Sequence, residues 1–284
     1  MYDAEYTRKF YNAYGDREWQ RLEATPYGRL QAIIHEDMLK RYVRPGDKLL
    51  DAGSGPGRFS IAAAKAGANI TMLDISDEQL EIARGKISAA GLNDSIENFI
   101  RADICNLSMF SEDEYDVVVC FGGALSYVCE NRQKAAKELI RVARPGGAIL
   151  VSAMSKHGPI INVVQMNDIT TLKDPDKPTH NGPSLWSVVQ TGDLGGFPSR
   201  AAGMPHAAMH LYTARELAGL FSKCMILEIT GSNVTMREYS PTNNELAANP
   251  EVWKTVVEME RRLNHEPGLI DTGSHIIIAA AKEP

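Results

Sequence analysis

The chain has 284 residues, 44% of them hydrophobic and 23% charged, and this composition predicts a folded globular protein with a sizeable buried core. Its net charge of −6 comes without any cluster of basic side chains, so binding to nucleic acid or to an anionic membrane is not expected. The four cysteines show neither CxxC pairs nor zinc-ligand spacing, no apolar run is long enough to span a bilayer, and no signal peptide is recognisable. We therefore expect a cytoplasmic protein with reduced thiols.

Residues 1–45 are rich in aromatic and charged side chains and predict two or three helices ahead of the first strand. One of them is expected over Gly28–Tyr42, where apolar side chains recur at helical spacing and Pro45 and Gly46 follow as terminators. We expect this segment to form a helical cap.

From residue 46 onward, short apolar runs alternate with helical segments, as in repeated βα units. The expected strands are Lys48–Ala52, Asn69–Asp74, 96–101, Tyr115–Phe121 and Ala148–Ala153, and the expected helices are Gly57–Ala66, 76–91 and Arg132–Ala143. After an interruption, we expect a helix over Thr213–Ser222, a strand over Met225–Thr230, a helix over Pro250–Leu263 and a strand over Ser274–Ala281. Repeated units of this kind predict an α/β fold with a doubly wound, mostly parallel sheet.

The interruption, residues 154–212, contains many glycines and prolines and no clean periodicity. Such a long irregular stretch is typical of a functional lid or of a disordered insertion. We therefore expect one domain over residues 1–284, with the cap at 1–45, the core at 46–153 and 213–284, and the lid in the interruption.

A glycine-rich loop, Asp51-Ala-Gly53-Ser-Gly55-Pro-Gly57, joins the first expected strand to the helix that follows it. Glycines allow a tight turn and the close approach of a ligand, and the start of the helix offers free backbone amides. Asp74 ends the next strand, and an acid about 20 residues after such a loop typically accepts hydrogen bonds from ribose hydroxyls. The pattern predicts a site for a nucleoside-containing cofactor; the simpler alternative makes Asp74 an ordinary turn residue.

These motifs resemble those of the class I (Rossmann-like) S-adenosylmethionine-dependent methyltransferases, most strongly over residues 46–153. The family's first motif is an acid followed by GxGxG, whereas dehydrogenases prefer GxGxxG, which would require a glycine in place of Arg58. A last strand at Gly273–Ala281 and the length of chain before the loop also favour the methyltransferase. The resemblance implies a seven-stranded sheet with an antiparallel last strand, S-adenosyl-L-methionine as cofactor and S-adenosyl-L-homocysteine as product.

The resemblance also implies which residues contact the cofactor. It assigns the methionyl part to Asp51, Gly53, Ser54, Cys120 and Phe121, the supporting loop to Gly55 and Gly57, and the adenosyl part to Asp74, Ile75, Asp103 and Ile104. Related enzymes often close the cofactor site with N-terminal helices, which makes Tyr11 and Arg29 candidates to cover that site. Arg29 or a tyrosine would then meet the carboxylate of the cofactor. Packing of these aromatic residues onto the sheet is the alternative.

Methyl transfer is an in-line displacement that depends mainly on alignment, and a general base is needed only where the nucleophile must lose a proton. Tyr127, just past the fourth strand, faces the substrate side by resemblance, with packing as the alternative. His210, in the lid, is a candidate general base, and its spacing from His206 would place both on one face of a helix. Three interpretations of His210 stay open: a structural contact, a base and half of a metal pair. No third metal ligand is visible, so no metal is expected.

The sequence lacks the Asn/Asp-Pro-Pro-aromatic run of DNA-base methyltransferases, the paired glutamates of protein arginine methyltransferases and a catechol-type metal cluster. These absences leave a small-molecule methyl acceptor, modified at O, N, S or C. The alternatives are a non-catalytic S-adenosylmethionine-binding or regulatory protein and an NAD-dependent oxidoreductase.

Overall fold

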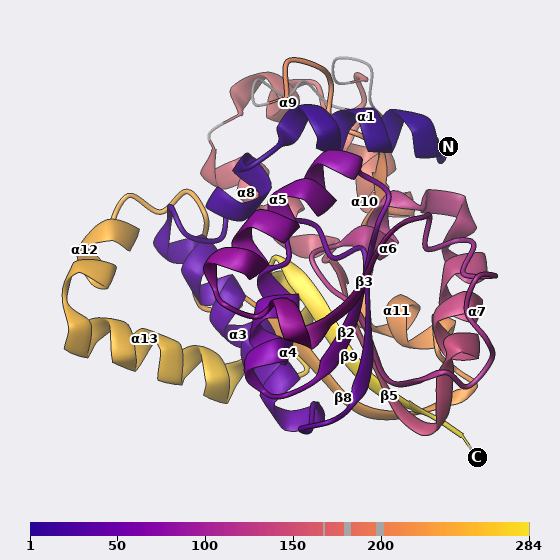
Figure 1. Ribbon diagram of the computed structural model, residues 1–284. Coiled ribbons are helices and arrows are strands. Elements are labelled where there is room, and N and C mark those ends of the chain that lie inside the picture. The colour runs from indigo at the N-terminus through magenta and orange to yellow at the C-terminus, as the bar shows by residue number, and fades with distance from the viewer. Residues whose placement is uncertain (167, 179–182, 197–201, 284) are drawn as a thin grey trace.

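A seven-stranded sheet in the order β3-β2-β1-β4-β5-β9-β8 forms the centre of the molecule (Figure 1). The computed structural model describes residues 1–166, 168–178, 183–196 and 202–283. The strands are β1 (Lys48–Ala52), β2 (Asn69–Asp74), β3 (Ile96–Arg101), β4 (Tyr115–Cys120), β5 (Ala143–Met154), β8 (Cys224–Ser232) and β9 (His275–Lys282). Only β9 runs antiparallel to its neighbours in this sheet, which confirms the predicted fold class.

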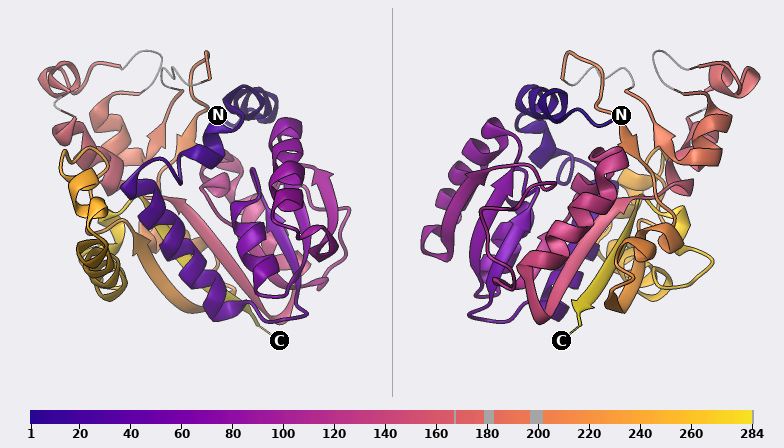
Figure 2. Two further views of the ribbon diagram at one scale, coloured as in Figure 1. Left: turned by 60° about the vertical axis from the view of Figure 1, so that its left-hand side comes forward. Right: turned by 90° about the vertical axis from the view of Figure 1, so that its right-hand side faces the viewer.

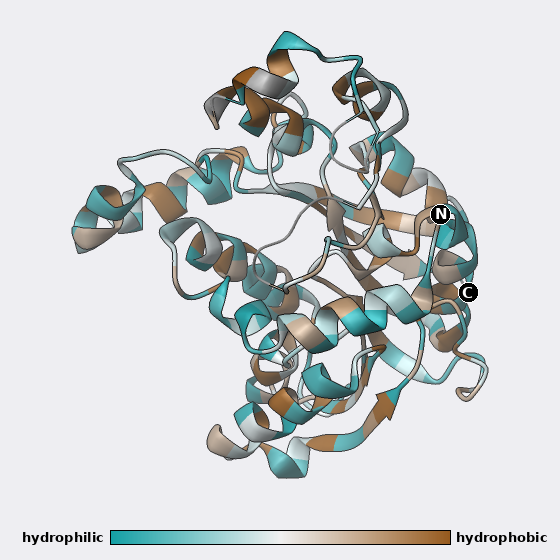
Figure 3. Cartoon of the chain, turned by 90° about the horizontal axis from the view of Figure 1, so that it is seen from above, coloured by the Kyte–Doolittle hydropathy of each residue, from teal (hydrophilic) through white to brown (hydrophobic). Residues whose placement is uncertain are grey.

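Helices cover both faces of the sheet (Figure 2). The core helices are α4 (Arg58–Lys65), α5 (Asp77–Ala89), α6 (Ala124–Tyr127), α7 (Arg132–Val142), α11 (Ala214–Leu220), α12 (Asn243–Ala248) and α13 (Pro250–Leu263). Successive residues of β4 point to opposite faces, so Val118 packs in one hydrophobic cluster and Val117 and Val119 pack in the other. Seen from above (Figure 3), teal and brown alternate along the outer helices, as in amphipathic helices that cover a buried sheet. Within the described ranges, no helix combines the length and apolar character needed to cross a bilayer.

The fifth strand begins earlier than its apolar pattern indicates. Residues 144–147, which lie between the expected helix and the expected strand, belong to β5, and the pairing with β4 shifts register between Tyr115 and Val117. Gly146, with φ of 72°, supplies the left-handed backbone that this irregular start requires.

The predicted cap consists of α1 (Ala4–Tyr14), α2 (Arg17–Gln20) and α3 (Pro26–Tyr42). Thr25 caps α3, because its Oγ1 accepts the Gly28 amide at 3.0 Å while Pro26 occupies the first turn. In Figures 1 and 2, α1 lies across the top of the sheet, beside the segment that follows β5.

The predicted lid contains more regular structure than its composition indicates. Its elements are α8 (His157–Gln165), α9 (Ile169–Lys173), α10 (Leu185–Thr191), β6 (Asp193–Leu194) and β7 (Met209–His210). These pieces are too short to produce a clear period in the sequence. His206 lies before β7 and His210 lies within it, so the expectation that the two share a helical face is wrong. His180 lies outside the described residues.

Gly28 allows the cap to pack closely on itself. A Cβ at this position would overlap the carbonyl oxygen of Arg21 and approach Cα of Leu22 to 3.0 Å. Leu22 is buried in the cluster that α3 shares with β1. The absence of a side chain at Gly28 therefore fixes where the turn after α2 meets α3.

Replacing this glycine is expected to destabilise the protein. Gly28→Ala forces the Arg21–Leu22 backbone away from α3 and should lower the free energy of unfolding by about 1–3 kcal/mol, as overpacking does elsewhere. The control is Gly85→Ala in α5, where a Cβ meets nothing within 4 Å. It should be neutral or stabilising by up to about 1 kcal/mol, since alanine favours a helix. Urea unfolding of both variants measures the difference, and equal effects would contradict the packing argument.

Candidate active site

The glycine-rich loop leaves β1 with a backbone that only glycine adopts easily. Gly53, Gly55 and Gly57 have φ values of 85°, 51° and 86°. The amides of Gly53 and Ser54 both donate to the carbonyl oxygen of Leu73, at 2.7 and 2.9 Å, so the loop is tied to the end of β2. A Cβ on Gly53 would also come within 2.5 Å of Ala124 Cβ on α6, which makes that position specific for glycine.

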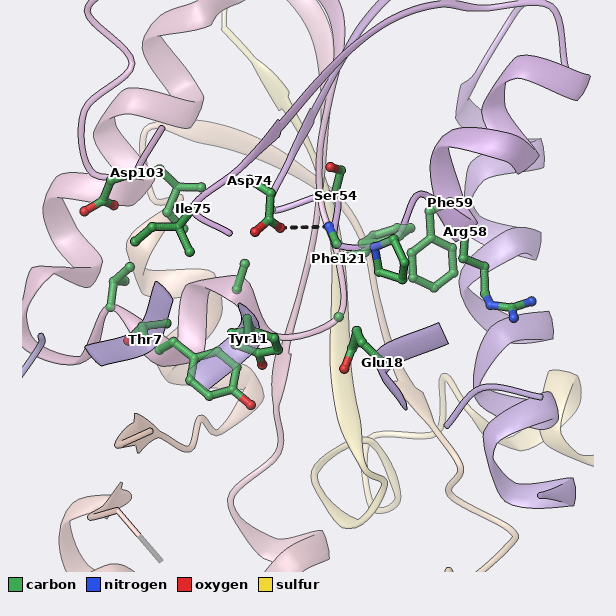
Figure 4. Close-up of a pocket in the computed structure, with 18 of the residues that line it drawn as sticks. Thr7, Tyr11, Glu18, Ser54, Arg58, Phe59, Asp74, Ile75, Asp103 and Phe121 are labelled. Atoms are coloured by element: carbon green, nitrogen blue, oxygen red, sulfur yellow. Dashed lines mark hydrogen bonds between the residues drawn. The ribbon is translucent and has the colours of Figure 1, made fainter. Parts of the chain in front are cut away.

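Asp74 faces a cleft beside this loop (Figure 4). Its Oδ2 accepts the Gly55 amide at 2.8 Å, and its Oδ1 accepts the Ser76 amide at 2.8 Å. Burial raises the pKa of Asp74 to about 6, although these two amides favour the ionised form. The carboxylate is thus held in place by backbone donors, with acceptor capacity left for a ligand.

We call this space the glycine-loop cleft. The predicted residues that line it are Tyr11, Gly53, Ser54, Gly55, Asp74, Ile75, Asp103, Ile104, Phe121 and Tyr127. In Figure 4, Asp74, Ile75 and Asp103 lie along one side, and Thr7 and Tyr11 of α1 face them. Most of the predicted site residues therefore meet here.

Three predicted residues lie behind the cleft rather than on its surface. The Asp51 side chain accepts a hydrogen bond from Ser60 Oγ at 2.6 Å and so joins β1 to α4, while burial raises its pKa to about 7. Gly57 packs beside Met72 of β2, and Cys120 is fully buried in the core. The prediction that these three residues contact the cofactor is therefore corrected. They support the loop and the strand ends instead.

Tyr2 covers the far end of the cleft. Its hydroxyl donates to Asp103 Oδ2 at 2.7 Å, while Asp103 Oδ1 accepts the Cys105 amide at 2.8 Å. No sequence pattern indicates Tyr2, because its contact with Asp103 spans 101 positions of the chain. Both carboxylate oxygens of Asp103 are thereby oriented.

The predicted role of Arg29 is wrong, and Arg21 occupies the place expected for it. Arg29 is exposed, donates to the Glu23 carbonyl oxygen and lies over the Trp253 ring. Arg21 lines the glycine-loop cleft and pairs with Glu18, one of its Nη atoms lying 2.6 Å from Glu18 Oε1. The sequence does not predict the break between α2 and α3, which sets the direction of Arg21. The one sequence feature that could have indicated Arg21 is its spacing of three from Glu18, which is typical of an ion pair on a helix.

A second cavity of about 520 Å³, the lid chamber, adjoins the cleft. Both spaces are lined by Tyr11, Glu18, Arg21, Gly122 and Tyr127, which therefore form the junction between them. The walls come from all three cap helices, from α8 and β7 of the lid, and from the start of β9. The cap and lid thus enclose a space at the end of β4.

Tyr127 lies at this junction among other aromatic rings. Its hydroxyl is 3.5 Å from His206 Nε2, and its ring meets Tyr11 edge-on at a centroid distance of 5.4 Å. Burial raises the pKa of Tyr127 above its usual value, so the phenol stays protonated and can donate a hydrogen bond. The structure brings together the predicted Tyr11 and Tyr127.

His210 lines neither space. Its Nδ1 is 2.6 Å from Asp193 Oδ1 and its Nε2 is 2.7 Å from Glu216 Oε1, so both ring nitrogens already have partners within the protein. Only 1% of the residue is exposed. Of the three interpretations, the structural contact fits, and the role of general base is withdrawn. The part of the chain that the structure describes also contains no group of three or more His, Cys, Asp or Glu that could hold a metal ion.

Residues 49–147 match the family model described as "Methyltransferase domain". The chain is 37% identical over 111 residues to a demethylmenaquinone methyltransferase of Clavibacter sepedonicus, covering 39% of this chain and 42% of that one. It is 36% identical over 111 residues to a malonyl-[acyl-carrier protein] O-methyltransferase of Pectobacterium atrosepticum, covering 39% and 40%. An uncharacterized protein of Mycobacterium bovis is 34% identical over 116 residues, covering 41% and 40%. The match thus spans about two fifths of the length of these relatives.

Solved structures share the fold over more of the chain. A chain from the complex between the Haloferax volcanii Trm112 methyltransferase activator and a methyltransferase has a TM-score of 0.60, with 16% identity and 98% of both chains covered. A SAM-dependent methyltransferase of Methanosarcina mazei has a TM-score of 0.57, with 19% identity, and covers 87% of this chain and 97% of that one.

The sequence match confirms the predicted resemblance and disfavours the NAD-dependent alternative. The matched residues contain the glycine-rich loop, Asp74 and Asp103, so the match coincides with the glycine-loop cleft. Residues 49–147 therefore match a methyltransferase domain, and the sheet to which they belong has the mostly parallel, seven-stranded topology that the resemblance implied.

Proposed function

We propose that this protein is an enzyme that transfers the methyl group of S-adenosylmethionine to a small-molecule acceptor bound in the lid chamber. The observation that carries the proposal is that the glycine-loop cleft and the lid chamber share a junction at Tyr11, Glu18, Arg21, Gly122 and Tyr127. A site for cofactor binding alone needs no second enclosed space at this position. When bound, the cofactor supplies an activated methyl group on a sulfonium whose leaving group is neutral.

The adenosyl part of the cofactor fits the side of the cleft next to β2 and β3. Asp74, held by backbone amides, would accept hydrogen bonds from the ribose hydroxyls. Ile75 and Ile104 would pack against the adenine ring, and Asp103 would accept from its amino group. These residues supply carboxylates for the polar groups of the ribose and adenine, and apolar surface for the faces of the adenine ring.

The methionyl part fits the opposite end. Arg21 and Glu18 form an ion pair there, and the carboxylate and ammonium of an amino acid present the same two charges. Arg21 would therefore meet the cofactor's carboxylate and Glu18 its ammonium. This arrangement places the methyl-bearing end of the cofactor toward the junction.

The lid chamber fits a partly apolar acceptor. Its walls include Phe10, Tyr14, Met154 and Met209, and about 520 Å³ lies within the usual range of small-molecule sites. The relatives are named for very different acceptors, demethylmenaquinone and malonyl-[acyl-carrier protein], so the chamber and not the names guides the choice. Tyr127 can donate a hydrogen bond at the junction and so orient the acceptor against the methyl group.

Asp74 is expected to control cofactor affinity and its pH dependence. Asp74→Ala should raise the Kd for S-adenosylhomocysteine by about tenfold or more, since hydrogen bonds to a charged group contribute roughly 1.5–3 kcal/mol. In the wild type, affinity should fall as the pH drops below about 6, because the raised pKa of Asp74 lets it take up a proton there and lose acceptor capacity. Isothermal titration from pH 5 to 8 measures both effects.

Two variants control for this result. Asp74→Asn should bind weakly at every pH, while Asp77→Asn, at an exposed carboxylate of α5, should keep the wild-type profile. A pH profile that survives Asp74→Asn would remove the ribose assignment.

Arg21 and Arg29 are expected to differ sharply. Arg21→Met should weaken binding of S-adenosylhomocysteine by about tenfold, the effect of losing one charged hydrogen-bond partner, while Arg29→Met should leave it unchanged. Methylthioadenosine lacks the amino-acid part, so its affinity should not respond to Arg21→Met. Weakening of both ligands by Arg21→Met would point to a folding defect and not to a carboxylate contact.

The reaction itself is tested by release of S-adenosylhomocysteine. Wild-type protein given S-adenosylmethionine and fractions of a metabolite extract should form this product with at least one fraction. With that fraction, Tyr127→Phe should lower kcat by about tenfold, as expected for loss of an orienting contact, while cofactor affinity stays within about twofold. Tight cofactor binding without product in any fraction would favour the non-catalytic alternative.

A further inference from the structure

Two buried side chains on the wall of the lid chamber have polar atoms without a partner in the protein. Gln31 is 4% exposed and His275 is 3% exposed, and both line the chamber. Neither Gln31 Nε2 nor His275 Nε2 has a hydrogen-bond partner among the described residues. Leaving a buried polar group unpaired is unfavourable, so two such atoms in one cavity point to a ligand that pairs with them.

The two residues come from adjacent elements. On α3, Tyr27, Gln31 and His35 follow one another at a spacing of four and so lie along one face of the helix. The His35 ring lies 5.6 Å from the His275 ring, and Tyr27 lines the chamber together with Ser274. This face of α3 therefore packs along the start of β9, with Gln31 between Tyr27 and His35.

The surroundings of His275 fix which of its nitrogens carries the hydrogen. Its Nδ1 is 3.1 Å from Ser274 Oγ, and Ser274 Oγ donates to the Ser232 carbonyl oxygen at 3.2 Å. The Asn233 Oδ1 atom, 3.3 Å away, is a second acceptor for the same hydroxyl, since Asn233 Nδ2 is turned toward the Tyr27 carbonyl. Two oxygen acceptors are thus available to the Ser274 hydrogen, and we therefore assign Nδ1 as the protonated nitrogen of His275, which donates to Ser274 Oγ.

The Nε2 atom of His275 is then left with a lone pair that can accept. Burial, with His35 and Arg21 nearby, lowers the pKa of His275 well below its usual value, so the ring is neutral. Gln31 Nε2, an amide nitrogen, can only donate. The chamber wall therefore presents one acceptor and one donor, both uncharged.

We propose that Gln31 and His275 bind an uncharged hydroxyl group of the methyl acceptor, which donates to His275 Nε2 and accepts from Gln31 Nε2. The inference rests on the proposed function, because it treats the lid chamber as the acceptor's site. A carboxylate cannot donate to the His275 lone pair, whereas a hydroxyl can donate there and also pair with the Gln31 amide. Combined with the aromatic and methionine walls, the pair selects a neutral, hydroxyl-bearing, largely apolar acceptor such as a phenol.

The subsite lies close to the reacting end of the chamber. The Nε2 atom of His275 is 3.7 Å from the place where a Cβ of Gly123 would lie, and the neighbouring Gly122 lines both spaces. A hydroxyl bound there is therefore held beside the junction.

The test compares 2-naphthol with 2-methylnaphthalene, which has nearly the same shape but no hydroxyl. Affinities are measured by ligand-induced fluorescence changes in full-length protein saturated with S-adenosylhomocysteine. The wild type should bind 2-naphthol at least about tenfold more tightly than 2-methylnaphthalene, and more tightly than 2-naphthoate. Gln31→Met and His275→Phe should each bring the ratio of the 2-naphthol affinity to the 2-methylnaphthalene affinity close to one. The affinity for 2-methylnaphthalene itself should be retained. His275→Gln, which keeps an acceptor oxygen, should restore most of the preference.

Matched substitutions at exposed positions, Gln190→Met and His265→Phe, should leave the ratio unchanged. A wild-type ratio near one, a preference for 2-naphthoate, binding of neither probe, or a ratio that survives both Gln31→Met and His275→Phe would overturn the inference. If His275→Phe fails to fold, Gln31→Met and His275→Gln decide the result.

Binding of S-adenosylhomocysteine to the same samples separates this inference from the proposed function. Protein that binds S-adenosylhomocysteine but shows no hydroxyl preference contradicts only the subsite. Protein that does not bind S-adenosylhomocysteine contradicts the proposed function, whatever the naphthol affinities are.

Discussion

The hydrogen bond from the Gly55 amide to Asp74 is the interaction on which the rest of the site depends. It joins the ends of two neighbouring parallel strands, because Gly55 belongs to the loop after β1 and Asp74 ends β2. The amides of Gly53 and Ser54, which donate to Leu73, hold the loop from the same strand. The cleft thus has a fixed floor before the cap or the lid contributes anything. Burial raises the pKa of Asp74, and the cost of keeping it ionised is offset only by donors that point at it.

The cap and the lid convert this open strand edge into two connected spaces. The α1 helix covers the cleft through Tyr11, and α2 and the turn after it bring Glu18 and Arg21 to the junction. That turn can pack against α3 only because Gly28 has no side chain. The segment after β5 completes the enclosure of the lid chamber. Arg21 and Glu18 are only partly exposed there, and charges attract more strongly away from bulk water.

The sequence was most informative where a local pattern reflects a backbone requirement. The strands, the loop glycines and the carboxylate of Asp74 could be predicted because strand ends and positive φ angles leave residue signatures at fixed spacing. It failed where the outcome depends on contacts far apart in the chain. The sequence indicated Arg29 rather than Arg21, because the direction of a side chain after a helix break is set by packing. It indicated His210, because a histidine in a lid does not reveal that Asp193 and Glu216 already engage it.

The same distinction separates the glycine-loop cleft from the lid chamber. The family match covers residues 49–147, which include the glycine-rich loop, Asp74, Asp103 and Phe121, all on the cleft side. Gln31 and His275 lie outside that range, as do most of the residues that line only the lid chamber. The relatives align with this chain over only about two fifths of their length. It follows that the acceptor of this protein has to be inferred from its own cap, lid and last strand, where an uncharged donor and acceptor pair replaces the charged groups of the cleft.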